Sequence, residues 1–350
     1  MVRKGKSPAP SRAFSAFTTI HSNVAEVAEH KEHPCNHCIA PCCTTVTLHE
    51  FEPQTFRDVD YLGYLIGFSR IELGWLPSGT VEINYRAFCT NFDSKTAGCK
   101  VHGTDEQPLM CTEYDAHQCT YKAQFLGDQS TDMLRVSAAR FESIARQFSY
   151  DPKGTIVKRP TFAEISLGLE SSENEKTRSY ELKKYGPTLD PLPIPGVQAE
   201  EEPLSHQKLR SNPCSGCAAY CCRVLVFPLP APSDRREVSF YRYIAGFPGL
   251  EVALTPRGYI VQCFSKCQHL TESNQCELFN KARRPVFCST YDAWRCSFVP
   301  TYKNGTSLLR RLNRDEWAIV ESMFCYGEEG GVTHIPVYEE VIEALNPKQV

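Results

Sequence analysis

The sequence predicts an α+β fold made of two tandem, small and irregular cysteine-rich modules joined by a linker. Three observations predict it. The chain of 350 residues contains 18 cysteines, while apolar residues (41%) and charged residues (23%) occur in ordinary proportions. One cysteine spacing occurs twice, and short helix-like and strand-like patterns accompany both copies. A chain of this length also accommodates about two domains of typical size.

The repeat begins with four cysteines that follow a proline. Cys35, Cys38, Cys42 and Cys43 recur as Cys214, Cys217, Cys221 and Cys222, 179 positions later. Four more follow in each copy, 177 or 178 positions apart: Cys89, Cys99, Cys111 and Cys119, then Cys267, Cys276, Cys288 and Cys296. This order indicates an internal duplication with eight cysteines per copy. Cys263 and Cys325 lie outside the pattern and are expected to be ordinary buried thiols.

The duplication predicts five segments. Residues 1–29 form a flexible basic segment, 30–150 the first module, 151–207 a linker, 208–326 the second module and 327–350 a C-terminal segment. The linker is rich in proline and carries the acidic run 200–202, so we expect it to be largely extended.

Each module is expected to contain two helices, and the first module also a short strand. Apolar and aromatic residues at helical spacing predict a helix over residues 53–68 and another over 234–247, each ended by a glycine. Their aromatic residues are assigned to the core: Tyr61, Tyr64, Phe68, Tyr241, Tyr243 and Phe247. Alternating apolar residues predict a strand over 80–87, and residues 135–148 and 313–324 are predicted closing helices. Because the cysteines fall in turns and at element ends, we expect metal, rather than a large apolar core, to organise each module.

The cysteine spacing indicates a thiophilic metal. A Cys-x-x-Cys turn places two sulfurs on one side of a loop, and two such contributions complete a tetrahedral zinc site at about 2.3 Å. The three cysteines Cys35, Cys38 and Cys42 could equally hold three irons of a four-iron cluster. The expected cofactor is therefore zinc or iron, including [4Fe-4S], with the sixteen repeated cysteines as candidate ligands.

Adjacent cysteines constrain the ligand geometry. Neighbouring side chains diverge by about 100° on a helix and point to opposite faces of a strand, so we expect Cys42 and Cys43 to serve different metal positions. Disulfide pairing is the alternative. A bridge between vicinal cysteines is strained, and no export signal is visible, so we favour reduced thiols.

The histidines near the cysteines are not repeated. Gly216 and Phe279 stand where the first copy has His37 and His102. A ligand set common to both copies therefore consists of cysteine alone, while His102 remains an additional candidate in the first module.

The cysteine patterns resemble those of the YkgJ-type cysteine-cluster family, which is described as zinc- or iron-chelating. The later family motifs correspond to residues 89–92, 99–102 and 108–111, and again to 267–270, 276–279 and 285–288. Gln107 and Phe279 depart from the family pattern, and the resemblance leaves out the linker and the C-terminal segment. It implies chelation by cysteine. Flagellin lysine N-methylases are similar around the cysteine motif, which implies the rival function of an iron-sulfur enzyme.

The function expected from the sequence is metal binding in the cytoplasm, with metal ions as partners and a protein or peptide partner left open. The alternative is an iron-sulfur oxidoreductase or an enzyme that modifies a protein or peptide. A net charge of -3 gives no general attraction for nucleic acid, and no apolar run is long enough to span a membrane. No phosphate-binding glycine loop is present, so catalytic residues are not assigned.

Overall fold

The computed structural model describes residues 41–93, 96, 98–114, 133–170, 219–279, 281–291 and 309–346. Helices and antiparallel sheets both contribute, which confirms the predicted α+β class. The expected N-terminal segment 1–29 and most of the expected linker lie outside the described residues.

The first half builds one four-stranded antiparallel sheet. Its strands β1 (Thr45–Phe51), β2 (Ile71–Trp75), β3 (Val81–Arg86) and β6 (Leu134–Val136) lie in the order β1-β3-β2-β6. The remaining elements are η3 (Pro41–Cys43), α2 (Phe56–Leu65), β4 (Phe92–Asp93), β5 (Gly98–Cys99), α3 (Leu109–Thr112), α4 (Ala138–Ala145), β7 (Ser149–Tyr150), β8 (Ile156–Lys158) and α5 (Phe162–Glu170).

The second half repeats this topology. Its strands β9 (Val224–Pro228), β10 (Leu250–Thr255), β11 (Gly258–Phe264) and β12 (Arg310–Leu312) lie in the equivalent order β9-β11-β10-β12. The remaining elements are η7 (Tyr220–Cys222), α7 (Arg235–Ala245), α8 (Val286–Ser289), α10 (Arg314–Ser322), β13 (Cys325–Tyr326), β14 (Val332–His334) and α11 (Tyr338–Leu345). The repeat of elements continues past residues 150 and 326, because β7, β8 and α5 correspond to β13, β14 and α11.

The helices predicted from the sequence are confirmed, with shorter ends. Helix α2 begins after Thr55, whose side chain accepts a hydrogen bond from the Asp58 N–H while Asp58 bonds back to the Thr55 backbone. Asn313 caps α10 with the same reciprocal pair of bonds, while the Asp234 side chain accepts from the Glu237 N–H at the start of α7. Each cap satisfies a backbone donor that the first helical turn leaves without a partner.

Apolar side chains form a core that runs through both halves. On β3, Val81, Ile83 and Tyr85 are fully buried and belong to the same core as Leu62 and Leu65 of α2. In the second half, Val261 of β11 and Trp317 of α10 are buried equally deeply. The expectation that metal replaces a large apolar core is therefore wrong for the described residues. The sequence pattern correctly located the apolar face of the strand. Two sheets with covering helices, however, bury far more apolar surface than a loop-rich module would.

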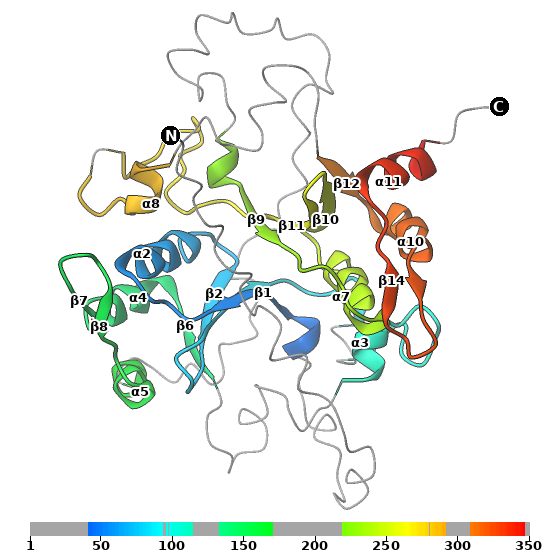
Figure 1. Cartoon of the computed structure of the whole chain (residues 1–350). Coiled ribbons are helices and arrows are strands. Elements are labelled where there is room, and N and C mark those ends of the chain that lie inside the picture. Colours follow the sequence, from blue (N-terminus) through cyan, green and yellow to red (C-terminus); the bar gives the residue numbers. More distant parts are fainter. Residues whose placement is uncertain are drawn as a thin grey trace, which may run out of the picture.

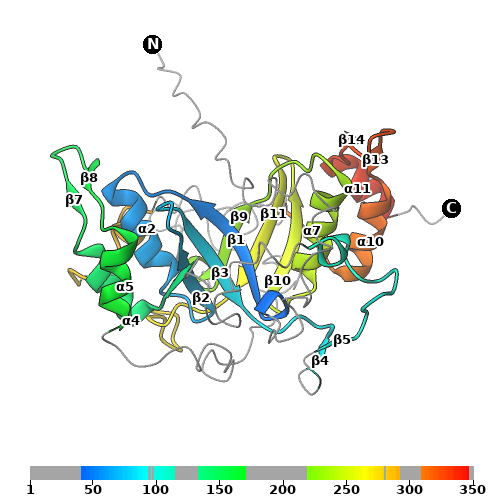
Figure 2. The same ribbon diagram turned by 90° about the horizontal axis from the view of Figure 1, so that it is seen from below.

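The two halves lie side by side. Figure 2 shows the two sheets at the centre, with α2, α4 and α5 on one outer side and α7, α10 and α11 on the other. Part of the expected linker belongs to the first half, since Ile165 of α5 is fully buried in the shared core. No helix among the described residues is long and apolar enough to cross a membrane.

One short helix of each half lies against the other half. Figure 1 shows α8 next to α2 and α3 next to α7, and both pairs are in contact. Because α3 and α8 carry Cys111 and Cys288, this exchange brings candidate ligands of one half to a helix of the other.

Candidate metal centres

The structure describes five candidate ligands in each half. The N-cluster comprises Cys42, Cys43, Cys89, Cys99 and Cys111, and the C-cluster comprises Cys221, Cys222, Cys267, Cys276 and Cys288. The other six candidates lie outside the described residues: Cys35, Cys38, Cys119, Cys214, Cys217 and Cys296. All twelve described cysteines, including the two that are not repeated, are free thiols.

Strand pairing brings distant cysteines together. Turn η3, which carries Cys43, leads into β1, while Cys89 follows the neighbouring antiparallel strand β3. The start of one strand therefore meets the end of the other, and the Cys89 N–H donates to the Cys43 carbonyl at 2.8 Å. The second sheet repeats this contact, with the Cys267 N–H 2.8 Å from the Cys222 carbonyl oxygen.

The remaining cysteines of each cluster reach the same neighbourhood on short elements. Burial raises the pKa of Cys111 to about 12, and the nearby thiols of Cys42, Cys89 and Cys99 contribute to this shift. Thiols raise one another's pKa because neighbouring negative charges repel. These four of the five sulfurs of the N-cluster therefore lie close enough to influence one another.

The C-cluster shows the same mutual influence, together with a nearby cation. Burial raises the pKa of Cys288 to about 12, Arg284 opposes the shift, and Cys267, Cys221 and Cys276 add to it. Arg284 also donates to the Cys288 carbonyl at 2.9 Å. Gln107 occupies the equivalent position of the first half, so the N-cluster has no arginine at this position.

The adjacent cysteines of the C-cluster do not diverge as expected. The sulfurs of Cys221 and Cys222, both on the 3-10 turn η7, are 3.9 Å apart. Two thiolates on one tetrahedral ion, each at about 2.3 Å, lie about 3.8 Å apart. This pair is therefore compatible with a single ion, and the expectation of two separate metal positions does not follow from its geometry.

Hydrogen bonding within each pair separates the two thiols chemically. The hydrogen bond from Cys222 lowers the pKa of Cys221 to about 7. In the N-cluster, a hydrogen bond with Cys43 raises the pKa of Cys42. One member of each pair thus keeps its proton more firmly than the other.

The donor set fits a thiophilic cation, although the described side chains do not yet close around one. Within the described residues, no three His, Cys, Asp or Glu side chains are arranged to hold a metal ion. The thiols are half-buried or exposed, yet partial loss of hydration still raises the pKa of Cys111 and Cys288, so ionisation of these two without a nearby cation is unfavourable. A coordinated metal replaces their protons and supplies the missing positive charge.

A tyrosine from the opposite half contacts each cluster. Tyr243 of α7 donates to the Cys42 carbonyl at 2.5 Å, and Tyr64 of α2 donates to the Cys221 carbonyl at 2.8 Å. Burial raises the pKa of both hydroxyl groups, so each remains protonated and able to donate. The sequence assigned both residues to the core and missed this role. The available signal was their survival at equivalent positions of the duplication.

Two further sequence assignments can be compared with the structure. Cys263 is fully buried, as expected, whereas Cys325 is exposed on β13, which corrects its assignment as a buried thiol. The His102 side chain is exposed, and its backbone N–H donates to the Cys99 carbonyl at 3.3 Å.

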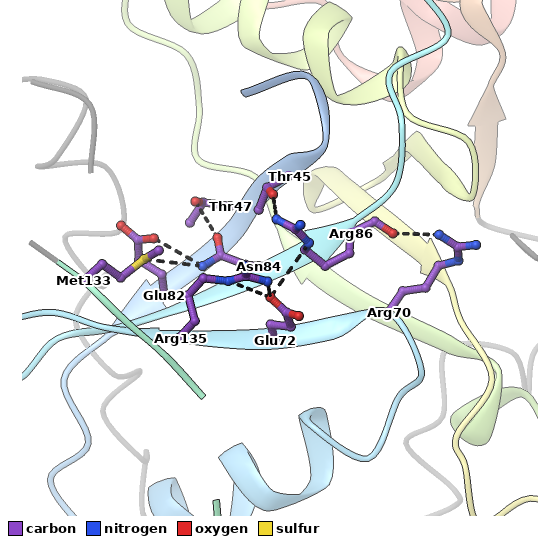
Figure 3. A network of polar contacts seen from close by, with 9 residues as sticks. All are labelled: Thr45, Thr47, Arg70, Glu72, Glu82, Asn84, Arg86, Met133 and Arg135. Atoms are coloured by element: carbon purple, nitrogen blue, oxygen red, sulfur yellow. Dashed lines mark hydrogen bonds and ion pairs between the residues drawn. The ribbon is translucent and has the colours of Figure 1, made fainter. Parts of the chain in front are cut away.

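A separate polar network occupies one face of the first sheet, shown in Figure 3. Glu72 accepts a hydrogen bond from Arg135 at 3.1 Å and lies 3.8 Å from the fully buried Arg86. Glu82 accepts from Asn84 at 3.3 Å. Burial raises the pKa of Glu82 to about 7, since its few polar contacts compensate only partly for lost hydration. This network contains no thiol of the clusters and is a structural feature of the sheet.

Comparison of the chain with protein-family models, curated proteins and solved structures finds no match.

Proposed function

We propose that the chain is a metal-binding protein that chelates zinc or iron through its two cysteine clusters. The observation that carries this proposal is the double occurrence of five thiols in one neighbourhood, built by equivalent elements of both halves. A structural need for sulfur does not account for it, because apolar residues already supply each half with a core. Zinc and iron favour thiolate donors, whereas magnesium and calcium favour oxygen.

A mononuclear ion in each cluster is favoured over a four-iron cluster. The 3.9 Å separation of the Cys221 and Cys222 sulfurs suits two ligands of one tetrahedral ion. A four-iron cluster binds one thiolate on each iron, which keeps its ligand sulfurs further apart. The repeated cysteines outside the described residues would complete the ligand shell.

Metal analysis of anaerobically purified protein tests the proposal. We expect zinc or iron without acid-labile sulfide, and we expect Cys89→Ala and Cys267→Ala each to lower the metal content by about half. Cys325→Ala is the matched control, because it removes an exposed thiol outside both clusters. Protein that contains neither zinc, iron nor copper, with its thiols oxidised in pairs, would contradict the proposal. A brown sample that contains sulfide and bleaches on reduction would instead support the iron-sulfur enzyme.

Metal could serve structure, sensing or trafficking in such a protein, and a reducing compartment such as the cytoplasm would preserve the thiols. The exposed first cysteine of each pair, Cys42 and Cys221, favours exchange of the ion with a partner over a purely structural ion. Structural metal sites are closed, whereas a site that transfers its metal ion must remain accessible to the partner that receives the ion.

A further inference from the structure

The two halves exchange contacts in a reciprocal pattern at the cysteine clusters. The Leu109 N–H at the start of α3 donates to Ser239 of α7 at 2.8 Å. The Val286 and Phe287 N–H groups at the start of α8 donate to the carboxylate of Asp60 on α2 at 2.8 and 2.7 Å. Asp60 and Ser239 occupy equivalent positions of the duplication, 179 residues apart. Each short helix that carries a cysteine is therefore anchored on the other half.

The end of each long helix also contacts the opposite cluster. The Thr90 N–H, next to Cys89, donates to the Gly246 carbonyl at 2.9 Å, and the Gln268 N–H, next to Cys267, donates to the Gly67 carbonyl at 2.8 Å. A β-carbon on Gly246 would lie 3.6 Å from the Cys89 sulfur. At the equivalent Gly67 a β-carbon would lie 3.8 Å from the Cys267 sulfur. One sulfur of each cluster, that of Cys89 or Cys267, thus packs directly on the end of a helix from the other half.

The tyrosine hydroxyl groups complete this pattern. Tyr243 reaches the carbonyl of Cys42, within the turn that directs the adjacent cysteine side chains, and Tyr64 reaches the carbonyl of Cys221. A hydrogen bond to a turn carbonyl restricts the orientation of that peptide and hence the direction of the following side chain. The tyrosines are not cluster ligands here, because their oxygens bond to carbonyl groups.

We propose that each cysteine cluster is positioned in trans, with its thiols supplied by one half and its ordering contacts by the tyrosine and helix end of the other. Tyr243 is then a positioning residue of the N-cluster, and Tyr64 is a positioning residue of the C-cluster. The consequence for metal loading rests on the proposed function. A cysteine substitution acts on the cluster of its own half, whereas a tyrosine substitution acts on the cluster of the opposite half.

Cysteine alkylation by iodoacetamide, resolved by peptide mass spectrometry, tests this positioning in the full chain as purified and after metal removal. Tyr243→Phe removes one hydrogen bond worth about 1 kcal/mol, so roughly fivefold faster alkylation is expected in the N-cluster, with Cys111 as a reporter. The C-cluster, reported by Cys288, should keep its wild-type rate. Tyr64→Phe should give the mirror-image result.

Tyr241→Phe is the matched control, because Tyr241 lies on the same helix and donates to the Pro230 carbonyl within its own half. It removes a buried hydroxyl group without touching either cluster, so both alkylation rates should match those of the wild type after correction for global stability. Faster alkylation in the variant's own half, in both clusters equally, or in neither would overturn the proposal.

The same data separate this inference from the proposed function. If wild-type thiols react equally with and without metal, and no metal is found, metal binding fails while the crossed pattern of the two tyrosine variants still decides the positioning role. If metal protects the wild-type thiols but the crossed pattern is missing, the positioning role fails and metal binding stands.

Discussion

We expect Glu82→Gln to stabilise the folded protein at neutral and alkaline pH. Glu82 lies on β3 with 6% of its surface exposed, directly across from Glu50 of β1. Burial is the largest cause that raises its pKa from 4.5 to about 7, and the charge of Glu50 adds to the shift. One pKa unit corresponds to about 1.36 kcal/mol, so ionising Glu82 in the folded state costs on the order of 3 kcal/mol.

The sign of the pH dependence follows from proton binding. Between pH 4.5 and about 7 the folded protein holds a proton on Glu82 that the unfolded chain has released. The contribution of this group to stability is therefore fully present below 4.5 and is lost as the pH rises to about 7. Glutamine stays neutral throughout, and its amide can donate to the Glu50 carboxylate. The variant should match the wild type in acid and exceed its stability by up to about 3 kcal/mol in base.

Denaturant unfolding of both proteins at about pH 5 and about pH 8 measures this difference. Any release of the proposed metal on acidification would be common to both proteins, so the difference between them isolates Glu82. Glu72→Gln is the matched control on the neighbouring strand, since Glu72 pairs with Arg135 and Arg86 and its neutralisation should destabilise the protein at alkaline pH. The reasoning is refuted if Glu82→Gln is no more stable, relative to the wild type, at the higher pH than at the lower.

Three further predictions follow from close contacts and from the core. Gly74→Ala places a β-carbon 2.4 Å from the Met133 sulfur and 2.7 Å from the Asn84 side-chain nitrogen, so thermal unfolding should show a loss of about 1–3 kcal/mol. Asp60→Ala removes the acceptor of two N–H groups at the start of α8 and should cost about 1–3 kcal/mol in the same assay. Asp60→Ser, which copies the equivalent Ser239, should recover much of that loss. If the proposed metal is bound, its removal by a chelator should leave most of the far-ultraviolet circular dichroism unchanged, because the apolar core persists, and should accelerate the alkylation of Cys111 and Cys288. Collapse of the whole spectrum would show that metal holds the sheets together.

The sequence predicted the elements whose residues repeat with a clear period. The helices around Tyr64 and Tyr243 and the strand around Ile83 follow from apolar spacing. The edge strands β6 and β12 are only three residues long, too short for a period to show. Sheet order depends on pairing between distant segments, which local periodicity does not encode.

The sequence pattern also did not predict that the polar face of the first sheet is buried. Alternation along β3 identifies Ile83 and Tyr85 as inward-facing, and the same alternation would place Asn84 and Arg86 in solvent. Both are buried, at 2% and 0% exposure. Polar residues on this face satisfy one another across strands, so burial depends on partners such as Glu72, which no local pattern identifies.

The candidate ligands were predictable because sulfur chemistry is visible in the residue type, whereas their arrangement depends on the exchange between halves. The duplication aligns Tyr64 with Tyr243 and Gly67 with Gly246, but a position shared by two copies does not reveal which copy it contacts. Core packing explains the presence of aromatic residues at these helix positions equally well, and the sequence favours that explanation.

Reciprocal positioning has a consequence for how a duplicated chain of this kind holds together. Each half has its own sheet and helices, although one apolar core runs through both halves. A half alone would expose the start of its short cysteine helix and lose the hydroxyl group that reaches its cysteine turn. The equivalent contacts Tyr64–Cys221 and Tyr243–Cys42 require two copies that face each other, which one chain supplies at a fixed, high effective concentration. Fusion of the copies therefore favours ordered cysteine clusters even where the separate halves would bind each other weakly.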